Sequence, residues 1–201
     1  MQKLTRADLM SLEQYADQRK AFRAQVMEHR KPRRVALGEH VTLLFEDRLT
    51  MQYQIQEMLR VERIFEAEGI EDELNAYNPL IPDGSNLKVT LLIEFGEVEE
   101  RKKALQELIG LEDKIWIRIG DFEPVTPIAD EDLEREDEEK TSSVHFLRFE
   151  FKPEMIAAAK NGAPLAIGVD HPCYSATLAP VPEATRMALV ADFDWGMTIR
   201  P

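Results

Sequence analysis

The clearest hydrophobic pattern lies between residues 50 and 68, where apolar side chains recur at helical spacing. One stripe of the predicted helix carries Met51, Ile55, Met58 and Phe65. Such a stripe is typical of a helix face that packs against a core, and Glu62 falls inside it. A carboxylate that leaves water must be paired, protonated or bound to a metal. The pattern therefore marks Glu62 as the first functional candidate, without naming a reaction.

The first fifty residues predict a long helix followed by a short β-hairpin. Ser11 and Gln14 have the spacing of a capping box, which begins a helix, and Pro32 ends that helix after about Arg30. Branched residues on both sides of Gly38 predict two strands. The strands are expected at 35–37 and 41–45, and a shorter helical segment after the helix at 50–68 is expected to end near residues 78–79.

From residue 87 onward, predicted strands and helices alternate. Strands are expected at 87–95, 114–119, 144–151 and 165–170, helices at 97–109 and 153–160, then a strand at 174–178 and a closing helix at 182–192. This order predicts an α+β protein with a ferredoxin-like split βαβ unit and a mainly antiparallel sheet. The acidic, proline-containing segment 122–142 has few apolar residues, and we expect it to be a mobile insertion.

The length of 201 residues is enough to bury a sizeable core, so we expect a single domain over 1–201. Within it, 1–86 would form an N-terminal helix and strand extension and 87–170 the ferredoxin-like unit. Residues 171–201 would add a C-terminal strand and helix.

Composition predicts a cytoplasmic protein. Cys173 is the only cysteine, which excludes an internal disulfide, and 31% of the residues are charged. The first residues lack the apolar segment of a signal peptide, and no stretch approaches the length of a membrane-spanning helix. We therefore expect no membrane partner.

The formal charge of −13 makes the chain acidic and argues against nucleic acid as a partner. The charge is nevertheless uneven. Residues 1–34 contain nine Lys or Arg and four Asp or Glu, whereas residues 130–139 are almost entirely acidic. Opposite charges of this kind can pair within one chain or between two copies, and we expect a homodimer.

Glu62 has two readings. In the first, its carboxylate serves a ligand or a proton transfer in a pocket between the 50–68 helix and the sheet, with Arg60 and His145 as further polar groups. In the second, it is a structural carboxylate satisfied by Arg33 or Arg34. The second reading is favoured, because structural ion pairs are common.

Metal and cofactor chemistry receives little support from the sequence. His145, His171, Cys173 and Glu62 are the conceivable metal ligands, but no helix carries the spacing of a metal motif. His145 alternates with apolar residues, which favours a core histidine, and Cys173 is read as structural. Phosphate-binding loops, dinucleotide fingerprints and nucleophile elbows are absent from the sequence. We therefore expect no cofactor, and an enzymatic activity is not favoured.

Several short segments together resemble an uncharacterised bacterial family whose members have about the length of this chain. They are Leu4–Tyr15, Arg33–Gly38, Leu43–Glu46, Gln54–Arg60, Tyr77–Asn78 and Asp170–Tyr174. Genes of that family often lie beside genes for a rubrerythrin-like protein and an iron–sulfur oxidoreductase. The resemblance thus implies a link to redox or oxidative-stress proteins and supplies no catalytic residue.

These observations lead to two hypotheses. The first is a cytoplasmic accessory or interaction protein, expected to be a homodimer, that serves a redox protein pair. The second is a small-molecule-binding protein or enzyme whose pocket joins the 50–68 helix to the sheet.

Overall fold

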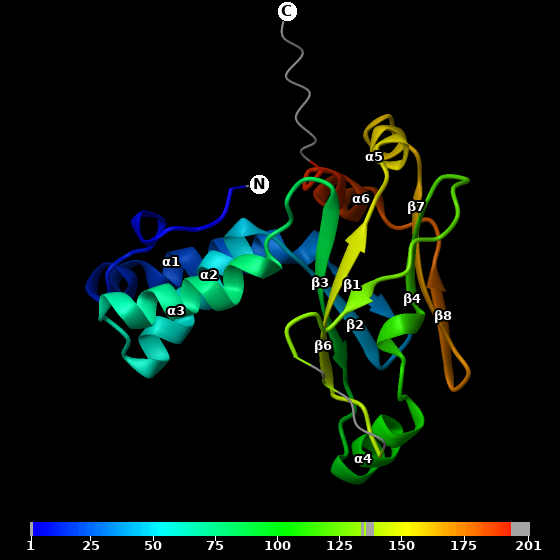
Figure 1. Ribbon diagram of the computed structural model, residues 1–201, viewed down its shortest axis with the longest axis horizontal. Helices are drawn as coiled ribbons and strands as arrows, with labels where there is room; N and C mark the ends of the chain where they lie inside the picture. Colours follow the sequence, from blue (N-terminus) through cyan, green and yellow to red (C-terminus); the bar gives the residue numbers. More distant parts are fainter. Residues whose placement is uncertain (1, 134, 136–138, 194–201) are drawn as a thin grey trace, which may run out of the picture.

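The structure is a computed structural model that describes residues 2–133, 135 and 139–193. Figure 1 shows a body of two β-sheets, a lobe of three helices that projects from one side, and single helices above and below the sheets. The α+β class predicted from the sequence is confirmed. No helix in these residues combines the length and apolarity that crossing a membrane requires.

The helices are α1 (Leu12–Arg30), α2 (Arg48–Glu62), α3 (Ala67–Tyr77), α4 (Val98–Glu107), α5 (Pro153–Lys160) and α6 (Glu183–Val190). The strands are β1 (Arg34–Leu37), β2 (Val41–Glu46), β3 (Asn86–Ile93), β4 (Ile115–Ile119), β5 (Ile128–Ala129), β6 (Val144–Glu150), β7 (Leu165–His171) and β8 (Tyr174–Leu178). Short 3₁₀ helices occupy Arg6–Asp8, Lys31–Arg33, Asn78–Leu80 and Glu112–Lys114.

The strands form two antiparallel sheets. The larger sheet has the order β1-β2-β3-β6-β5 and the smaller the order β4-β7-β8. The four strands of the predicted ferredoxin-like unit are thus divided, with β3 and β6 in one sheet and β4 and β7 in the other. The ferredoxin-like arrangement is not confirmed, because the choice of strand partner depends on long-range packing that a local pattern does not contain.

The two sheets share one hydrophobic core. Alternate residues of β3, namely Leu87, Val89, Leu91 and Ile93, are buried on its inner face. Residues of the smaller sheet such as Ile117 belong to the same cluster. The alternation of apolar and polar residues that predicted these strands therefore arises because one face of each strand is buried and the other faces outward.

Tyr174 joins the two sheets at one edge. Its hydroxyl donates a 2.6 Å hydrogen bond to the Leu37 carbonyl and accepts one of 3.1 Å from the His40 backbone N–H. Gly38 lies between these residues with φ of 70°. A Cβ at Gly38 would come within 2.5 Å of the tyrosine oxygen, so both the backbone angle and the contact require glycine.

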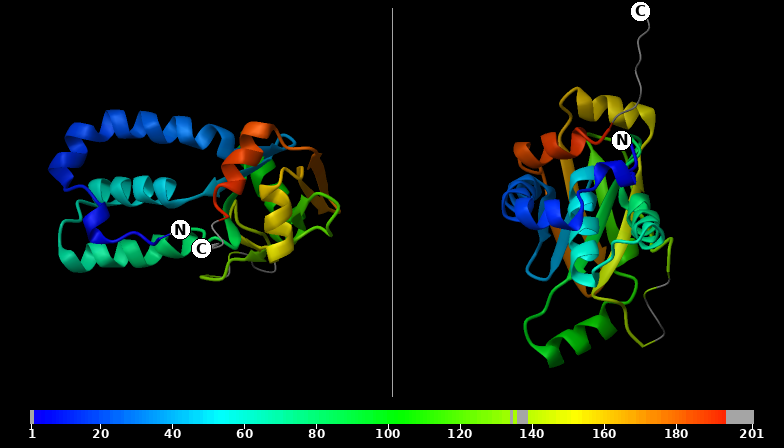
Figure 2. Two further views of the ribbon diagram at one scale, coloured as in Figure 1. Left: turned by 90° about the horizontal axis from the view of Figure 1, so that it is seen from above. Right: turned by 90° about the vertical axis from the view of Figure 1, so that its left-hand side faces the viewer.

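The helical lobe has its own hydrophobic cluster, formed by Leu4, Met51, Ile55, Leu59, Ile70, Leu74 and Ile81. Figure 2 shows α1, α2 and α3 side by side, extending away from the sheets. Asp47 begins α2 by accepting a 2.9 Å hydrogen bond from the Thr50 N–H. Arg63, in the left-handed conformation with φ of 57°, ends it. The helix predicted at 50–68 therefore ends earlier, at Glu62, and the shorter helix predicted after it is α3. The turn between them lies at the far end of the lobe.

The segment 122–142 was expected to be mobile. Residues 134 and 136–138 lie outside the described residues, so this expectation remains untested there. The described part includes β5, which pairs antiparallel with β6, and Val125, which pairs with Ile117 of the smaller sheet. This part of the segment is thus attached to both sheets.

Candidate functional site

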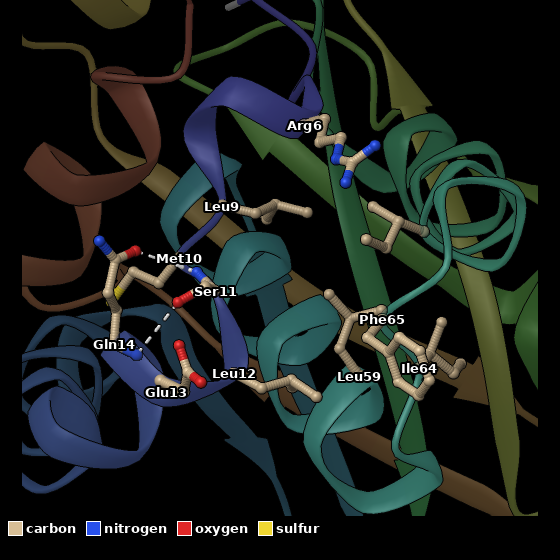
Figure 3. A pocket seen from close by; sticks show the side chains of 11 residues that line it. Arg6, Leu9, Met10, Ser11, Leu12, Glu13, Gln14, Leu59, Ile64 and Phe65 are labelled. Atoms are coloured by element: carbon tan, nitrogen blue, oxygen red, sulfur yellow. Dashed lines mark hydrogen bonds between the residues drawn. The ribbon is translucent and has the colours of Figure 1, made fainter.

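A cavity of about 570 Å³ lies at the end of the helical lobe (Figure 3). It is lined by Arg6, Leu9, Met10, Ser11, Leu12, Glu13, Gln14, Leu59, Ile64, Phe65 and Ile70. The lining thus comes from the N-terminal segment and from the turn between α2 and α3. We call this end of the lobe the tip, and the cavity the tip cavity. Its volume lies within the range of small-ligand pockets.

Hydrogen bonds hold the N-terminal segment against α2 and so form one wall of the cavity. The buried side chain of Gln56 accepts a 2.6 Å bond from the Met10 N–H and donates one of 3.3 Å to the Met10 carbonyl. Ser11 and Gln14 form the predicted capping box at the start of α1. The wall is therefore fixed by side chains whose hydrogen-bonding groups are satisfied.

Apolar side chains at the tip remain in contact with solvent. Phe65 is 70% exposed and Val61 is 57% exposed. Phe65 was predicted to pack against a core, and that prediction is wrong because the chain leaves the helix at Arg63. Exposed apolar side chains beside a cavity are a common feature of protein-binding surfaces.

Acidic side chains surround these apolar groups. Residues 57–73 contain seven Asp or Glu and two Arg. Within the described part of the chain, no ion pair is found for Glu62, Glu66, Glu68, Glu71, Asp72 or Glu73. Burial, followed by the negative charges of Asp72 and Glu62, raises the pKa of Glu73. The carboxylates of the tip therefore repel one another and lack internal cations.

Glu62 itself is exposed at the last position of α2. The prediction that it faces a core is wrong. Glu62 lies on the same side of α2 as Met51, as the helical spacing predicted. Neither α1 nor α3 covers this end of α2, so the side chain of Glu62 is exposed. Glu62 therefore needs no buried arginine.

Arg60 belongs to an ion-pair network between α1 and α2. Its guanidinium lies 3.4 Å from Glu57, which also accepts a 2.6 Å hydrogen bond from the Tyr15 hydroxyl and bonds of 2.7 and 2.9 Å from Arg19. The hydrogen bond from Arg19 is the main reason why the pKa of Glu57 falls to about 2. This network joins the two helices and does not line the tip cavity.

Arg33 is buried where the lobe meets the sheets. Its guanidinium donates bonds of 2.7 and 2.8 Å to Asp192, and its Nε lies 3.1 Å from Asp47. Asp47 is also 2.5 Å from His29. Burial raises the pKa of Asp192. Burial is the largest single effect on Arg33 and opposes its charge. The hydrogen bond and charge of Asp192, together with the charges of Asp47 and Glu46, outweigh burial and raise the pKa of the guanidinium.

The predicted partnership between Glu62 and Arg33 or Arg34 is therefore not found. Arg33 and Glu62 lie at opposite ends of α2, a helix about 22 Å long at ~1.5 Å per residue. Arg34 is mostly exposed and lies 3.7 Å from Glu94.

His145 is fully buried on the inner face of β6. Its ring nitrogens lie 2.6 Å from an Asp130 carboxylate oxygen and 2.9 Å from the Thr141 hydroxyl. Glu112 is 3.8 Å away. The predicted core histidine is thus correct, whereas a pocket that contains both His145 and the α2 residues Arg60 and Glu62 is not formed.

The conceivable metal ligands are also dispersed. His171 uses one ring nitrogen to contact the Ile109 carbonyl at 3.1 Å and the other to accept a bond from the Cys173 N–H. Cys173 is exposed. Among the described residues, no group of three or more His, Cys, Asp or Glu side chains could hold a metal ion.

The tip cavity and most of its lining residues were not predicted from the sequence. Ile64 and Phe65 are two adjacent apolar residues followed by a run of acidic ones, a pattern that could have indicated an apolar surface outside the core. The sequence pattern placed Ile64 and Phe65 in a continuous helix. The turn that separates them from α2 is at Arg63, a non-glycine residue in the left-handed conformation, which a sequence pattern rarely predicts.

The fold and the tip cavity together define a class of protein: an α+β protein in which a three-helix lobe presents a cavity with mixed polar and apolar lining and acidic surroundings. The chain belongs to the family described as "Protein of unknown function (DUF3501)", which matches residues 3–193. The resemblance to a bacterial family of unknown function is thereby confirmed.

The chain is also similar to a protein of unknown function from Burkholderia pseudomallei whose crystal structure is known. The two are 50% identical, with a TM-score of 0.89, over 96% of this chain and 100% of that chain. No curated protein matches the chain.

Proposed function

We propose that the protein is an interaction protein that binds a protein partner at the tip of its helical lobe. The observation that supports this function is the tip cavity of about 570 Å³, flanked by exposed Phe65 and Val61. An apolar side chain of the partner would enter the cavity, and Phe65 would lose its contact with water. Aromatic residues of this kind often contribute most of the binding energy at an interface.

The lining of the tip cavity favours binding over catalysis. Its charged side chains are Arg6 and Glu13, and the remaining groups are apolar or have hydroxyl, thioether or amide side chains. Among the described residues, the lining contains no histidine, cysteine, lysine or tyrosine, and its one hydroxyl, on Ser11, accepts a hydrogen bond from the Gln14 N–H as the cap of α1. Recognition of an apolar group is the chemistry that this lining supports.

The charges of the tip favour a basic partner. Carboxylates without internal cations, among them Glu62, Glu66 and Glu68, would pair with Lys or Arg residues on both sides of the apolar anchor. Such complementarity increases the association rate and orients the partner. Two copies of the tip would repel each other, so a homodimer, which remains a proposal, would use another surface.

The first partners to test follow from the family resemblance. They are the rubrerythrin-like protein and the iron–sulfur oxidoreductase whose genes often lie beside those of the family. We place the interaction in the cytoplasm, because Cys173 is an exposed free thiol of the kind that persists in a reducing compartment.

The proposed interaction can be tested by measuring the Kd between the purified protein and each purified candidate partner, at low and at high salt. Phe65→Ser should weaken binding roughly 10-fold or more. Glu66→Lys combined with Glu68→Lys should weaken it at low salt and have less effect at high salt, because salt screens exposed charges. Met187→Ser is the matched control, since Met187 is 62% exposed on the distant helix α6.

If the protein binds neither candidate, the proposed interaction with a redox protein is wrong. Binding that Phe65→Ser leaves unchanged would show that the tip is not the contact surface. Sedimentation of the parent and of Phe65→Ser adds a separate outcome: a dimer that the substitution dissociates would assign the tip to self-association.

A further inference from the structure

A second cavity, of about 400 Å³, lies between the helical lobe and the outer face of the larger sheet. It is lined by Asn75, Ala76, Tyr77, Pro79, Leu80, Lys88, Glu131, Asp132, Phe146, Leu147 and Arg148. The end of α3 and the 3₁₀ helix after it contribute one wall, and β3 and β6 contribute the other. We call it the Lys88 cavity.

The two sheet residues that bring positive charge into this cavity are neighbours. Lys88 on β3 and Arg148 on β6 occupy directly opposite positions in the antiparallel pair. Both point to the outer face of the sheet, since the residues on either side of Lys88 in β3, Leu87 and Val89, are buried in the core. The cavity therefore has two adjacent cations on one wall.

Arg148 is fully engaged by carboxylates of the protein. Its guanidinium donates bonds of 2.7 and 2.6 Å to Glu131, and a further bond of 2.5 Å to Glu150. Glu150 also accepts a 2.8 Å bond from the Asn86 side chain. These carboxylates are thus committed to other donors.

Lys88 has no ion pair or side-chain hydrogen bond within the described part of the chain, although it is half-buried. Glu46, its opposite neighbour on β2, instead accepts a 2.8 Å bond from the Thr90 hydroxyl. Burial, followed by the positive charge of Arg148, lowers the pKa of Lys88, and the negative charges of Glu131, Asp83 and Glu150 offset this only in part. A half-buried ammonium that no carboxylate contacts directly would be stabilised by a carboxylate that a ligand brings.

The remaining walls would suit an apolar group. Tyr77, Leu80 and Phe146 contribute aromatic and aliphatic surface. Arg135 lies 4.6 Å from the Phe146 ring centroid and binds Asp132, so that side of the cavity is held in place. Three of the charged lining residues, Arg148, Glu131 and Asp132, are held in ion pairs within the protein. A small ligand would therefore meet Lys88 and several apolar side chains, a combination typical of ligand pockets.

We propose that the Lys88 cavity binds a small organic carboxylate with an apolar body, and that Lys88 receives the carboxylate. The apolar body would lie against Tyr77, Leu80 and Phe146. This site is separate from the tip cavity, and the inference does not depend on the partner proposed above.

Calorimetry and chemical-shift mapping of the full chain with benzoate, phenylacetate and hexanoate test the inference. At least one carboxylate should bind saturably and shift the amide signals of residues 75–80, 88 and 146–148. Benzamide, which has the same body as benzoate without the charge, should bind at least 10-fold more weakly. Inorganic phosphate, which has charge without an apolar body, should also bind at least 10-fold more weakly.

Lys88→Met should weaken carboxylate binding at least 10-fold, whereas Lys20→Met, at an exposed position of α1, should leave it unchanged. Phe65→Ser should also leave it unchanged, which separates this result from the partner test. The inference is overturned if none of the three carboxylates binds by 10 mM, on the order of the weakest affinity that a specific site would show. Equal binding of benzamide, or equal binding by Lys88→Met, would overturn it too.

Discussion

Arg33 and Asp192 are 159 positions apart in the sequence, yet they form a buried, two-bond ion pair at 2.7 and 2.8 Å. Asp47, the residue that caps α2, contacts the same guanidinium. One arginine thereby joins the segment between α1 and β1, the start of α2, and the end of α6. The orientation of the helical lobe relative to the sheets depends on this junction.

Asp192→Asn should destabilise the protein by about 3–5 kcal/mol, because the substitution leaves a buried guanidinium short of negative charge. Urea unfolding measures the change as a lower midpoint. Arg34→Gln is the control, since Arg34 is exposed and should change stability by less than ~0.5 kcal/mol. Equal effects of the two substitutions would show that the junction contributes little.

Glu62→Gln should leave the free energy of unfolding unchanged within about 0.5 kcal/mol, because Glu62 is exposed and has no ion-pair partner among the residues that the structure describes. The same urea titration tests this result. Removal of a charge from the acidic tip would, if anything, reduce repulsion. A loss of several kcal/mol would contradict the position of Glu62 at the exposed end of α2.

The carboxylate of Glu57 should make stability fall in acid. Its pKa is about 2 in the folded protein and 4.5 in the absence of partners. Its contribution is therefore complete above pH 4.5 and is lost as the pH falls from about 4.5 towards 2. Glu57→Gln should destabilise by roughly 1–2 kcal/mol at pH 7, since Arg19 and Tyr15 lose a charged acceptor.

The difference in free energy of unfolding between the parent and Glu57→Gln should shrink over that acid range. Glu13→Gln, at an exposed position in the first turn of α1, serves as the control and should change the free energy of unfolding at pH 7 by less than about 0.5 kcal/mol. A difference that stays constant between pH 5 and pH 2.5 would contradict the assignment.

His145→Gln should loosen the described part of the acidic segment. His145 contacts Asp130, whose backbone has a positive φ of 47°, and this contact helps to maintain that conformation. The substitution should cost about 1–3 kcal/mol and make cleavage after Glu131 faster. Limited proteolysis with a glutamate-specific protease, read by mass spectrometry, measures the rate. His40→Gln, on the turn between β1 and β2, should leave the rate unchanged.

Much of the secondary structure followed from local sequence. The capping box at Ser11, the proline at the start of α5 and the alternation in β3 each act over a few residues, so their signals are contained in short segments. The division of strands between two sheets did not follow, because it results from contacts such as that of Tyr174 with Leu37, 137 residues away.

The candidate sites were harder to predict. Glu62 matched the apolar stripe, but burial requires a neighbouring element to cover it, and helical projection contains no such information. The Lys88 cavity requires α3 to lie over the outer face of the sheet. The positive charge of Lys88 is visible in the sequence, whereas the sequence does not show that Lys88 has no direct ion pair among the described residues.

Helix α3 contributes Ile70 to the tip cavity and Tyr77 to the Lys88 cavity, two turns or about 10 Å further along. A displacement of α3 along its axis would alter both cavities at once. If an occupant of one cavity shifts α3, it changes the affinity of the other by some factor, and the second occupant must change the first affinity by that same factor. Any linkage between the two proposed sites would therefore pass through a single helix of eleven residues.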